Sequence, residues 1–191
     1  RFCAHLSQLG LHLLARRRQR QQHPADRIAP GPTRPGSGAQ VATQVLDASA
    51  DMARQAITGH SMSGHGALTL ALGHPGRFRS VSAFAPICHP VASDWGRRQF
   101  RAYLGADETK WAAHDSTLLM RRKGFDGPVL VDQGASDQFL DRLMPEALSE
   151  AMAARRQQAV MRMQKGYDHS YFFVASFMEA HVAFHAEALR G

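Results

Sequence analysis

The sequence has few cysteines and no long apolar run. Its 191 residues include only 2 cysteines, Cys3 and Cys88, which argues against the disulfide framework of a small secreted domain and favours a reducing compartment. No apolar stretch approaches the roughly 20 residues of a membrane-spanning helix, and the first charges follow the apolar residues, unlike in a usual signal peptide. We therefore expect a cytoplasmic protein without a membrane partner. A chain of this length holds one ordinary domain with a sizeable core.

The sequence also lacks an even distribution of its positive charge. Of the net charge of +7, residues 1–50 carry seven arginines and no lysine against Asp26 and Asp47, which leaves 7 − 2 = +5 there. Acids and bases intermingle in the rest of the chain, so we expect no nucleic-acid partner. Residues 15–45 contain no aromatic residue and are rich in Arg, Gln, Pro and Gly, which cannot bury a core. We expect residues 1–50 to be a disordered or non-native basic extension, with a basic interaction module as the alternative.

From about residue 51 the chain alternates between short β-branched runs and helical patterns, with no internal repeat. The runs predict strands at residues 55–58, 79–85, 128–132 and 160–163. Helical periods predict helices at residues 64–72, 110–122, 145–156 and 169–189. This alternation implies an α/β fold in which a parallel sheet is covered by helices on both faces.

The stretch ITGHSMSGHGAL, residues 57–68, places Ser61 in a glycine-rich turn between the first predicted strand and the first helix. A strand, a tight turn and a helix are the context in which a nucleophilic serine is held above a sheet in a strained conformation. The motif G-x-S-x-G is met at Gly59 and Ser61, whereas Ser63 occupies its last position. A serine that only caps the helix N-terminus is the alternative.

A serine hydroxyl needs a histidine to accept its proton, and that histidine needs a carboxylate to fix its tautomer. Downstream of Ser61, the segment LVDQGASDQFL offers Asp132 at a strand end and Asp137 in the following loop, and QKGYDHSYFF places His169 after the fourth predicted strand. The order Ser, Asp, His is that of the α/β hydrolases. The residues alone do not decide whether Asp132 or Asp137 is the carboxylate partner of the histidine, and each could instead be a structural loop residue.

Four segments carry a family resemblance: GHSMSGHGALTLALGHPGRFRSVSAFAPICHP, WGRRQFRAYLG, LVDQGASDQFL and GYDHSYFFVASFMEAH. In this order and spacing they resemble the S-formylglutathione hydrolases, also called esterase D, of the α/β-hydrolase superfamily. The resemblance covers about residues 51–189. Because family members have well over a hundred residues before the serine turn, it implies that residues 51–191 are the C-terminal part of an α/β-hydrolase domain, with half of its mostly parallel sheet.

The resemblance also implies an activity and a set of roles. Ser61 is implied to be the nucleophile, Asp137 the acid and His169 the base, and the family reaction is hydrolysis of S-formylglutathione to formate and glutathione, with cleavage of simple carboxylic esters. The N–H of Met62 would bind the oxyanion, and no cofactor is needed. The substrate is then a small thioester or ester. A catalytically inactive fragment is the alternative, and self-association as a homodimer stays open.

Several other residues have both a functional and a packing interpretation. His60, His65, His74 and His89 lie near the serine turn, but their spacing matches no metal template, so no metal site is expected. His181 and His185 are four apart, yet Val182 stands where H-E-x-x-H has glutamate, which favours packing histidines. Cys88 is expected to be a buried inert thiol rather than a pocket residue. Trp95 and Phe100 either wall the acyl pocket, as we expect for Trp95, or pack beneath a loop.

Overall fold

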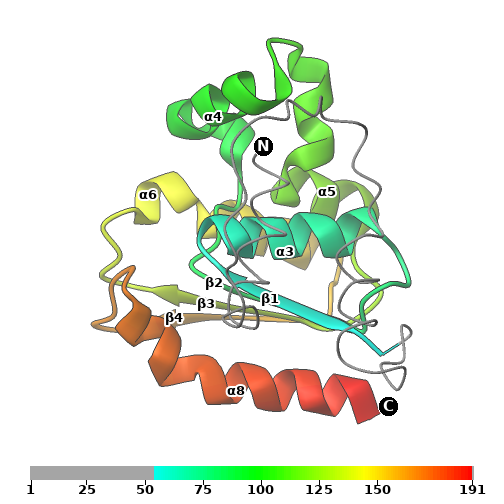
Figure 1. The fold of residues 1–191 in the computed structure, drawn as a ribbon, viewed down its shortest axis with the longest axis vertical. Coiled ribbons are helices and arrows are strands. Elements are labelled where there is room, and N and C mark those ends of the chain that lie inside the picture. Colours follow the sequence, from blue (N-terminus) through cyan, green and yellow to red (C-terminus); the bar gives the residue numbers. More distant parts are fainter. Residues whose placement is uncertain (1–53, 191) are drawn as a thin grey trace, which may run out of the picture. The chain divides into compact units, whose positions relative to one another are not determined.

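The computed structural model describes residues 54–190, which form a four-stranded sheet and its covering helices (Figure 1). The predicted extension, residues 1–50, lies outside the described residues. The strands are β1 (Ala56–His60), β2 (Ser80–Phe84), β3 (Val129–Gly134) and β4 (Ala159–Gln164). They are all parallel and lie in the sheet in chain order, β1-β2-β3-β4. The predicted α/β class with a parallel sheet is confirmed.

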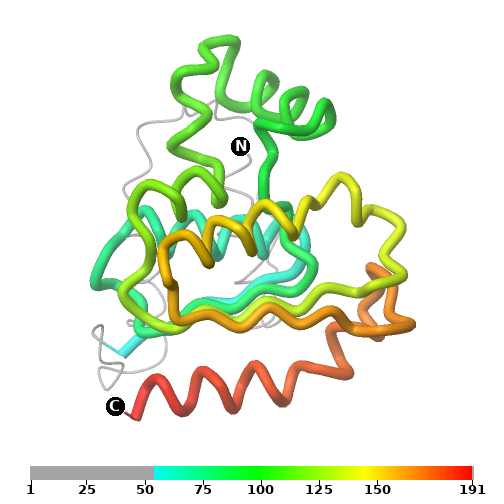
Figure 2. The backbone as a smooth tube through the Cα atoms, turned by 180° about the vertical axis from the view of Figure 1, so that it is seen from behind, coloured from blue at the N-terminus to red at the C-terminus, as the bar shows by residue number. Residues whose placement is uncertain are grey.

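Helices cover both faces of the sheet, as predicted, but unequally. The helices α3 (Met62–Gly73), α5 (Ser116–Lys123) and α7 (Pro145–Ala154) lie on one face, and α8 (Tyr171–Arg190) lies on the other (Figures 1 and 2). Each parallel crossover is right-handed in nearly all proteins, so strands added always in the same direction place their crossover helices on the same face. The second face is therefore left to α8, the element that follows the last strand.

The core lies between the sheet and the three crossover helices. Its buried residues include Leu68, Leu72, Val81, Leu119, Met120, Val129, Val131, Leu148 and Met152. The strands β2 and β3 are buried along their whole length, as expected for inner strands of a parallel sheet covered on both faces. No helix within residues 54–190 is long and apolar enough to span a membrane.

Strand β1 continues past its predicted end. The glycine turn was expected to stop the strand at Thr58, but Gly59 and His60 still pair with Ala83 and Phe84 of β2. The glycine is there because α3 passes close above the strand. A Cβ on Gly59 would lie 2.3 Å from the carbonyl oxygen of Ser63. Ser61 therefore follows directly after His60, the last residue of β1.

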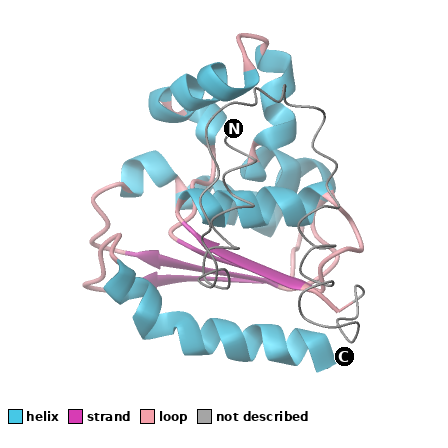
Figure 3. Cartoon of the chain, viewed as in Figure 1, coloured by secondary structure: helices cyan, strands magenta, loops and turns pink. Residues whose placement is uncertain are grey.

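The prediction of one helix at residues 110–122 was wrong. The segment holds a 3₁₀ helix, η2 (Glu108–His114), followed by α5 (Figure 3). Asp115 stands between them. The Asp115 carboxylate accepts the N–H of Leu118 at 3.0 Å, so it caps α5 and ends the preceding turn. Three further elements were not predicted: η1 (Pro90–Ala92), α4 (Asp94–Leu104) and α6 (Leu140–Leu143).

Candidate active site

Ser61 occupies the sharp turn between β1 and α3. Its backbone angles are φ 56° and ψ −118°, a combination that is sparsely populated for any residue with a side chain and is typical of functional sites. The strained residue is held by the N–H of Ser61, which donates to the carbonyl oxygen of Phe84 at 2.8 Å. The side chain makes no capping hydrogen bond to α3. The alternative of a simple helix cap is therefore wrong.

The structure brings Ser61, His169 and Asp137 together. His169 Nε2 lies 2.8 Å from Ser61 Oγ, and His169 Nδ1 lies 2.7 Å from Asp137 Oδ2. His169 stands in the loop between β4 and α8, two residues before the helix, so the predicted helix start at residue 169 was too early. The two ring nitrogens are thus placed between a hydroxyl and a carboxylate, which is the geometry of a nucleophile, its base and an orienting acid.

The Asp137 carboxylate is buried and accepts two further hydrogen bonds. The Phe139 N–H donates to Oδ1 at 2.8 Å, and Gln133 Nε2 donates at 2.9 Å to Oδ2, the oxygen that faces His169. Gln133 is fully buried, and its Oε1 has no hydrogen-bond partner among residues 54–190. Its amide nitrogen also faces the carbonyl oxygen of Gly134, so both neighbours are acceptors and the amide orientation is fixed. Sequence reasoning missed Gln133; its one available signal is a long polar residue at the end of a buried strand.

Two aromatic side chains enclose the ring of His169. The His60 ring lies 4.7 Å from it, and the Phe139 ring meets it edge to face at 5.1 Å, both between ring centroids. Burial, followed by the nearby His169, lowers the pKa of His60 to about 4. His60 therefore stays neutral at pH 7 and adds no positive charge beside the base when His169 accepts a proton.

Met62 and Trp95 pack against the same apolar cluster. Met62 is the first residue of α3, and the first hydrogen bond of that helix runs from the His65 N–H to the Ser61 carbonyl oxygen at 2.9 Å. The N–H of Met62 is therefore not used within the helix, and the N-terminal end of the helix favours negative charge. Trp95 lies in the first turn of α4, not in a loop. Its side chain and that of Met62 pack against the apolar cluster that contains Phe84.

Asp132, the other candidate acid, has different partners. It is buried on β3 and accepts hydrogen bonds from Arg162, Gln164 and His181. Burial alone would raise the pKa of Asp132, but these donors together lower it to about 2. Its alternation on the strand turns it toward α8, while Asp137 lies in the loop that follows the strand. Asp132 therefore makes no hydrogen bond to His169.

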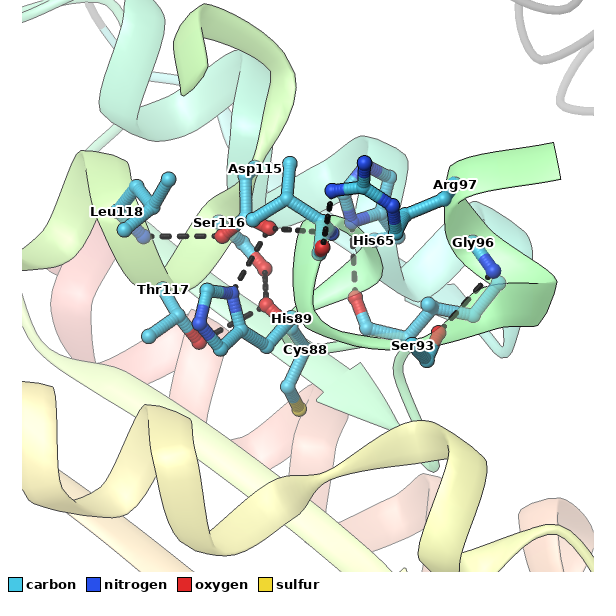
Figure 4. Close-up of polar contacts among 12 residues, drawn as sticks. His65, Cys88, His89, Ser93, Gly96, Arg97, Asp115, Ser116, Thr117 and Leu118 are labelled. Atoms are coloured by element: carbon cyan, nitrogen blue, oxygen red, sulfur yellow. Dashed lines mark hydrogen bonds and ion pairs between the residues drawn. The ribbon is translucent and has the colours of Figure 1, made fainter. Parts of the chain in front are cut away.

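His65, His89 and Cys88 lie in one packed polar cluster (Figure 4), whereas His74 lies at the C-terminal end of α3, where its Nδ1 faces the carbonyl oxygen of Leu70 at 3.0 Å. His89 Nδ1 lies 2.9 Å from Asp115 Oδ2, and His65 Nδ1 donates to the carbonyl oxygen of Ile87 at 2.8 Å. The described residues contain no group of histidine, cysteine and acidic side chains that could hold a metal ion. Cys88 is fully buried, and burial raises the pKa of its thiol, so the expectation of an inert thiol fits its surroundings.

Comparisons with known proteins bear on this arrangement. The esterase family model, described as "Putative esterase", matches residues 41–184. The chain belongs to this esterase family.

Two curated relatives of this chain share one name, S-formylglutathione hydrolase. The chain is 68% identical over 139 residues to an S-formylglutathione hydrolase of Paracoccus denitrificans (strain Pd 1222) and 49% identical over 144 residues to one of Rattus norvegicus, covering in each case 73% of the chain and 50% of the relative. A solved S-formylglutathione hydrolase from Agrobacterium tumefaciens has 42% sequence identity and a TM-score of 0.70, over 80% of this chain and 57% of that one. The resemblance to this group is confirmed, and the chain spans about half the length of the curated relatives it matches.

Proposed function

We propose that this chain is a serine hydrolase that cleaves S-formylglutathione to formate and glutathione, with activity on simple carboxylic esters. The observation that carries the proposal is the chain of contacts from Ser61 through His169 to Asp137, with 2.8 Å and 2.7 Å between the bonded atoms. The names of the relatives, at up to 68% identity, support the substrate. Hydrolysis of this thioester removes formaldehyde that has been captured by glutathione.

The proposed reaction proceeds in two halves. Ser61 Oγ attacks the formyl carbonyl carbon while His169 Nε2 takes the hydroxyl proton, and the resulting oxyanion is bound by the Met62 N–H. The C–S bond then breaks, glutathione leaves as a thiol with the proton from His169, and a formyl group stays on Ser61. A water molecule loses its proton to His169 and attacks this ester, which releases formate and restores the serine. Asp137 holds the imidazole and balances its charge throughout.

The substrate would enter over the N-terminal end of α3. We propose that Trp95, which packs against the same apolar cluster as Met62, forms a wall of the acyl site, and that the chain acts in the cytoplasm on a small soluble thioester. No cofactor takes part in the proposed steps, because the serine, histidine and carboxylate supply the nucleophile and all proton transfers.

A fluorophosphonate probe tests the proposal, since it reacts with a serine only when that serine is activated by its base. We expect the 191-residue chain to be labelled at Ser61, and Ser61→Ala to abolish both labelling and release of glutathione from S-formylglutathione. An unlabelled wild-type chain would favour the alternative of a catalytically inactive esterase fragment. Salt-dependent binding of the same chain to RNA would instead support a basic interaction module in residues 1–50.

A further inference from the structure

Helix α8 meets the sheet through a matched set of serines and histidines. On β2, Ser80, Ser82 and Phe84 alternate onto the face that α8 covers. His185 Nδ1 lies 2.8 Å from Ser80 Oγ, and His181 Nδ1 lies 2.8 Å from Ser82 Oγ. Two residues along a strand advance about 6.6 Å and four along a helix about 6 Å, so the two spacings agree. This match fixes how far α8 is shifted along β2.

The hydroxyl of Ser82 is the centre of this contact. Its Oγ lies within hydrogen-bonding distance of Thr58 Oγ1 at 2.8 Å, His181 Nδ1 at 2.8 Å and His185 Nε2 at 2.7 Å. One hydroxyl hydrogen and two acceptor sites suffice for three partners. All hydrogen-bonding positions of the Ser82 hydroxyl are therefore occupied. A displaced helix would leave buried polar atoms without partners, which would lower the stability of the folded state.

His181 is also anchored to a buried charge. Its Nε2 donates to Asp132 Oδ2 at 3.0 Å, and Arg162 pairs with the same carboxylate. Among the residues of α8, only His181 and Phe173 are classed as buried. The position of the helix therefore depends strongly on these two side chains.

Phe84 links this anchor to the nucleophile. The ring of Phe84 is stacked on the His181 ring, with 3.7 Å between centroids and 17° between planes, and meets the Phe173 ring edge to face at 5.8 Å. The carbonyl oxygen of the same Phe84 accepts the N–H of Ser61. One residue thus contacts both the helix that follows the base and the backbone of the serine.

We propose that His181 is a positioning residue, which holds α8 against Phe84 and Asp132 so that His169, just ahead of that helix, meets Ser61. This role rests on the proposed function. Neither His181 nor Phe84 touches the reacting atoms, and the effect is transmitted through the position of the helix start. A misplacement of about 1 Å at a catalytic group can lower a rate by about 100-fold, so a loosened α8 should be visible in turnover.

The test compares two His181 variants in the 191-residue chain. His181→Phe keeps an aromatic ring for Phe84 but loses the hydrogen bonds to Asp132 and Ser82, whereas His181→Gln keeps polar groups and loses the ring. Fluorophosphonate labelling counts the active serines, and hydrolysis of 4-nitrophenyl acetate gives the turnover for each labelled serine. We expect His181→Phe to lower kcat for each labelled serine by about 10- to 100-fold, with little change in KM. The kcat of His181→Gln should lie between those of His181→Phe and the wild type.

The matched control is His185→Asn. It removes hydrogen bonds to Ser80 and Ser82 in the same interface, but in the part of the chain that the structure describes His185 makes no hydrogen bond or ring contact with Phe84 or Asp132. We expect this variant to melt at a lower temperature while its turnover for each labelled serine stays within about twofold of wild type.

The outcomes separate the two proposals. If both His181 variants yield fewer labelled serines with unchanged turnover for each, His181 only stabilises the fold and the positioning role is overturned. If the wild-type chain neither accepts the label nor hydrolyses the ester, the proposed function itself fails, and the positioning role fails with it. A wild-type chain that does both, together with a slow His181→Phe, supports both.

Discussion

The two faces of the sheet are held by different kinds of contact. Toward α3, α5 and α7 the contacts are apolar, with Leu68, Leu72 and Leu148 fully buried. Toward α8, the contacts combine the Phe84 and Phe173 rings with a polar set, in which the sheet presents hydroxyls and a carboxylate and the helix presents His181 and His185. Apolar burial has little directional preference, whereas hydrogen bonds require defined distances and angles.

The two kinds of contact should affect stability and helix position differently. The helices of the apolar face can adjust by small amounts with little loss of buried area, and their main contribution is to the free energy of unfolding. The base His169 lies directly before α8, and His181 holds that helix against Phe84 and Asp132. We therefore expect substitutions that break these His181 contacts to change rate most, and substitutions on the opposite side to change stability most.

Removal of the base or the nucleophile should have the largest effect. We expect His169→Ala and Ser61→Ala each to lower kcat for S-formylglutathione by about 10⁶, because members of a triad act as one unit. Ser61→Ala should change the melting temperature little, whereas His169→Ala should lower it, because the largely buried ring is the partner of the buried Asp137 carboxylate. Steady-state kinetics and thermal melts check this, and a Ser61→Ala variant that keeps more than a small fraction of the rate would contradict the assignment.

The two buried carboxylates should differ in the next experiment. Asp137→Asn should lower kcat by about 10⁴, because an amide beside His169 Nδ1 favours the wrong tautomer. Asp132→Asn should cost at most about 100-fold in kcat, through a shifted α8, and should lower the melting temperature because Arg162 loses its ion pair. Kinetics and melts of both variants decide the ranking, and the reverse order would make Asp132 the catalytic acid.

A cavity on the apolar face should show the opposite pattern. Leu148 on α7 is fully buried in the core, so we expect Leu148→Ala to reduce the free energy of unfolding by about 2–5 kcal/mol. The turnover for each fluorophosphonate-labelled serine should stay close to wild type. Urea unfolding and active-site titration measure the two quantities separately. If Leu148→Ala lost as much turnover as His181→Phe, the two faces of the sheet would not differ in their effect on rate.

Much of this arrangement could be predicted from the sequence. The strand and helix order, the serine turn and the positions of Ser61 and His169 follow from short motifs whose context is local. The α8 contacts could not be predicted, because Ser80 and Ser82 meet histidines that lie about a hundred residues later. Serines spaced by two in a buried strand and histidines spaced by four in a helix are suggestive only after the two elements are known to pack together.

Other details depend on geometry that the motifs do not contain. Asp132 and Asp137 both follow the same apolar run, and only the length of the strand decides that one faces α8 and the other reaches His169. Helix α4 was missed because Gly96 and its arginines interrupt the apolar pattern. The glycine is needed there, since a Cβ would lie 2.2 Å from the carbonyl oxygen of Pro90. Its local indication was Ser93, whose hydroxyl caps the helix at the Gly96 N–H.

The smallest expected effect is a pH dependence of stability that arises mainly beside α8. Burial, followed by the nearby His181, lowers the pKa of His185 from 6.5 to about 4. His60 is lowered to about 4 in the same way. Between pH 6.5 and 4 the unfolded chain therefore binds protons at these positions that the folded chain does not, so stability falls as the pH falls through this window.

Asp132 affects stability at lower pH, because its pKa of about 2 lies below its ordinary value of 3.8. Its contribution to stability is present above pH 3.8 and is lost as the pH falls toward 2.

We expect the urea midpoint of the wild-type chain to decrease from pH 7 to pH 4.5, and the decrease to be smaller in His185→Asn, which has one histidine fewer to protonate on unfolding. Equal decreases in the two proteins would mean that His185 is already charged in the folded state. The α8 side would then contain an imidazolium between Ser80 and Ser82, and its hydrogen bonds would strengthen rather than weaken as the pH falls.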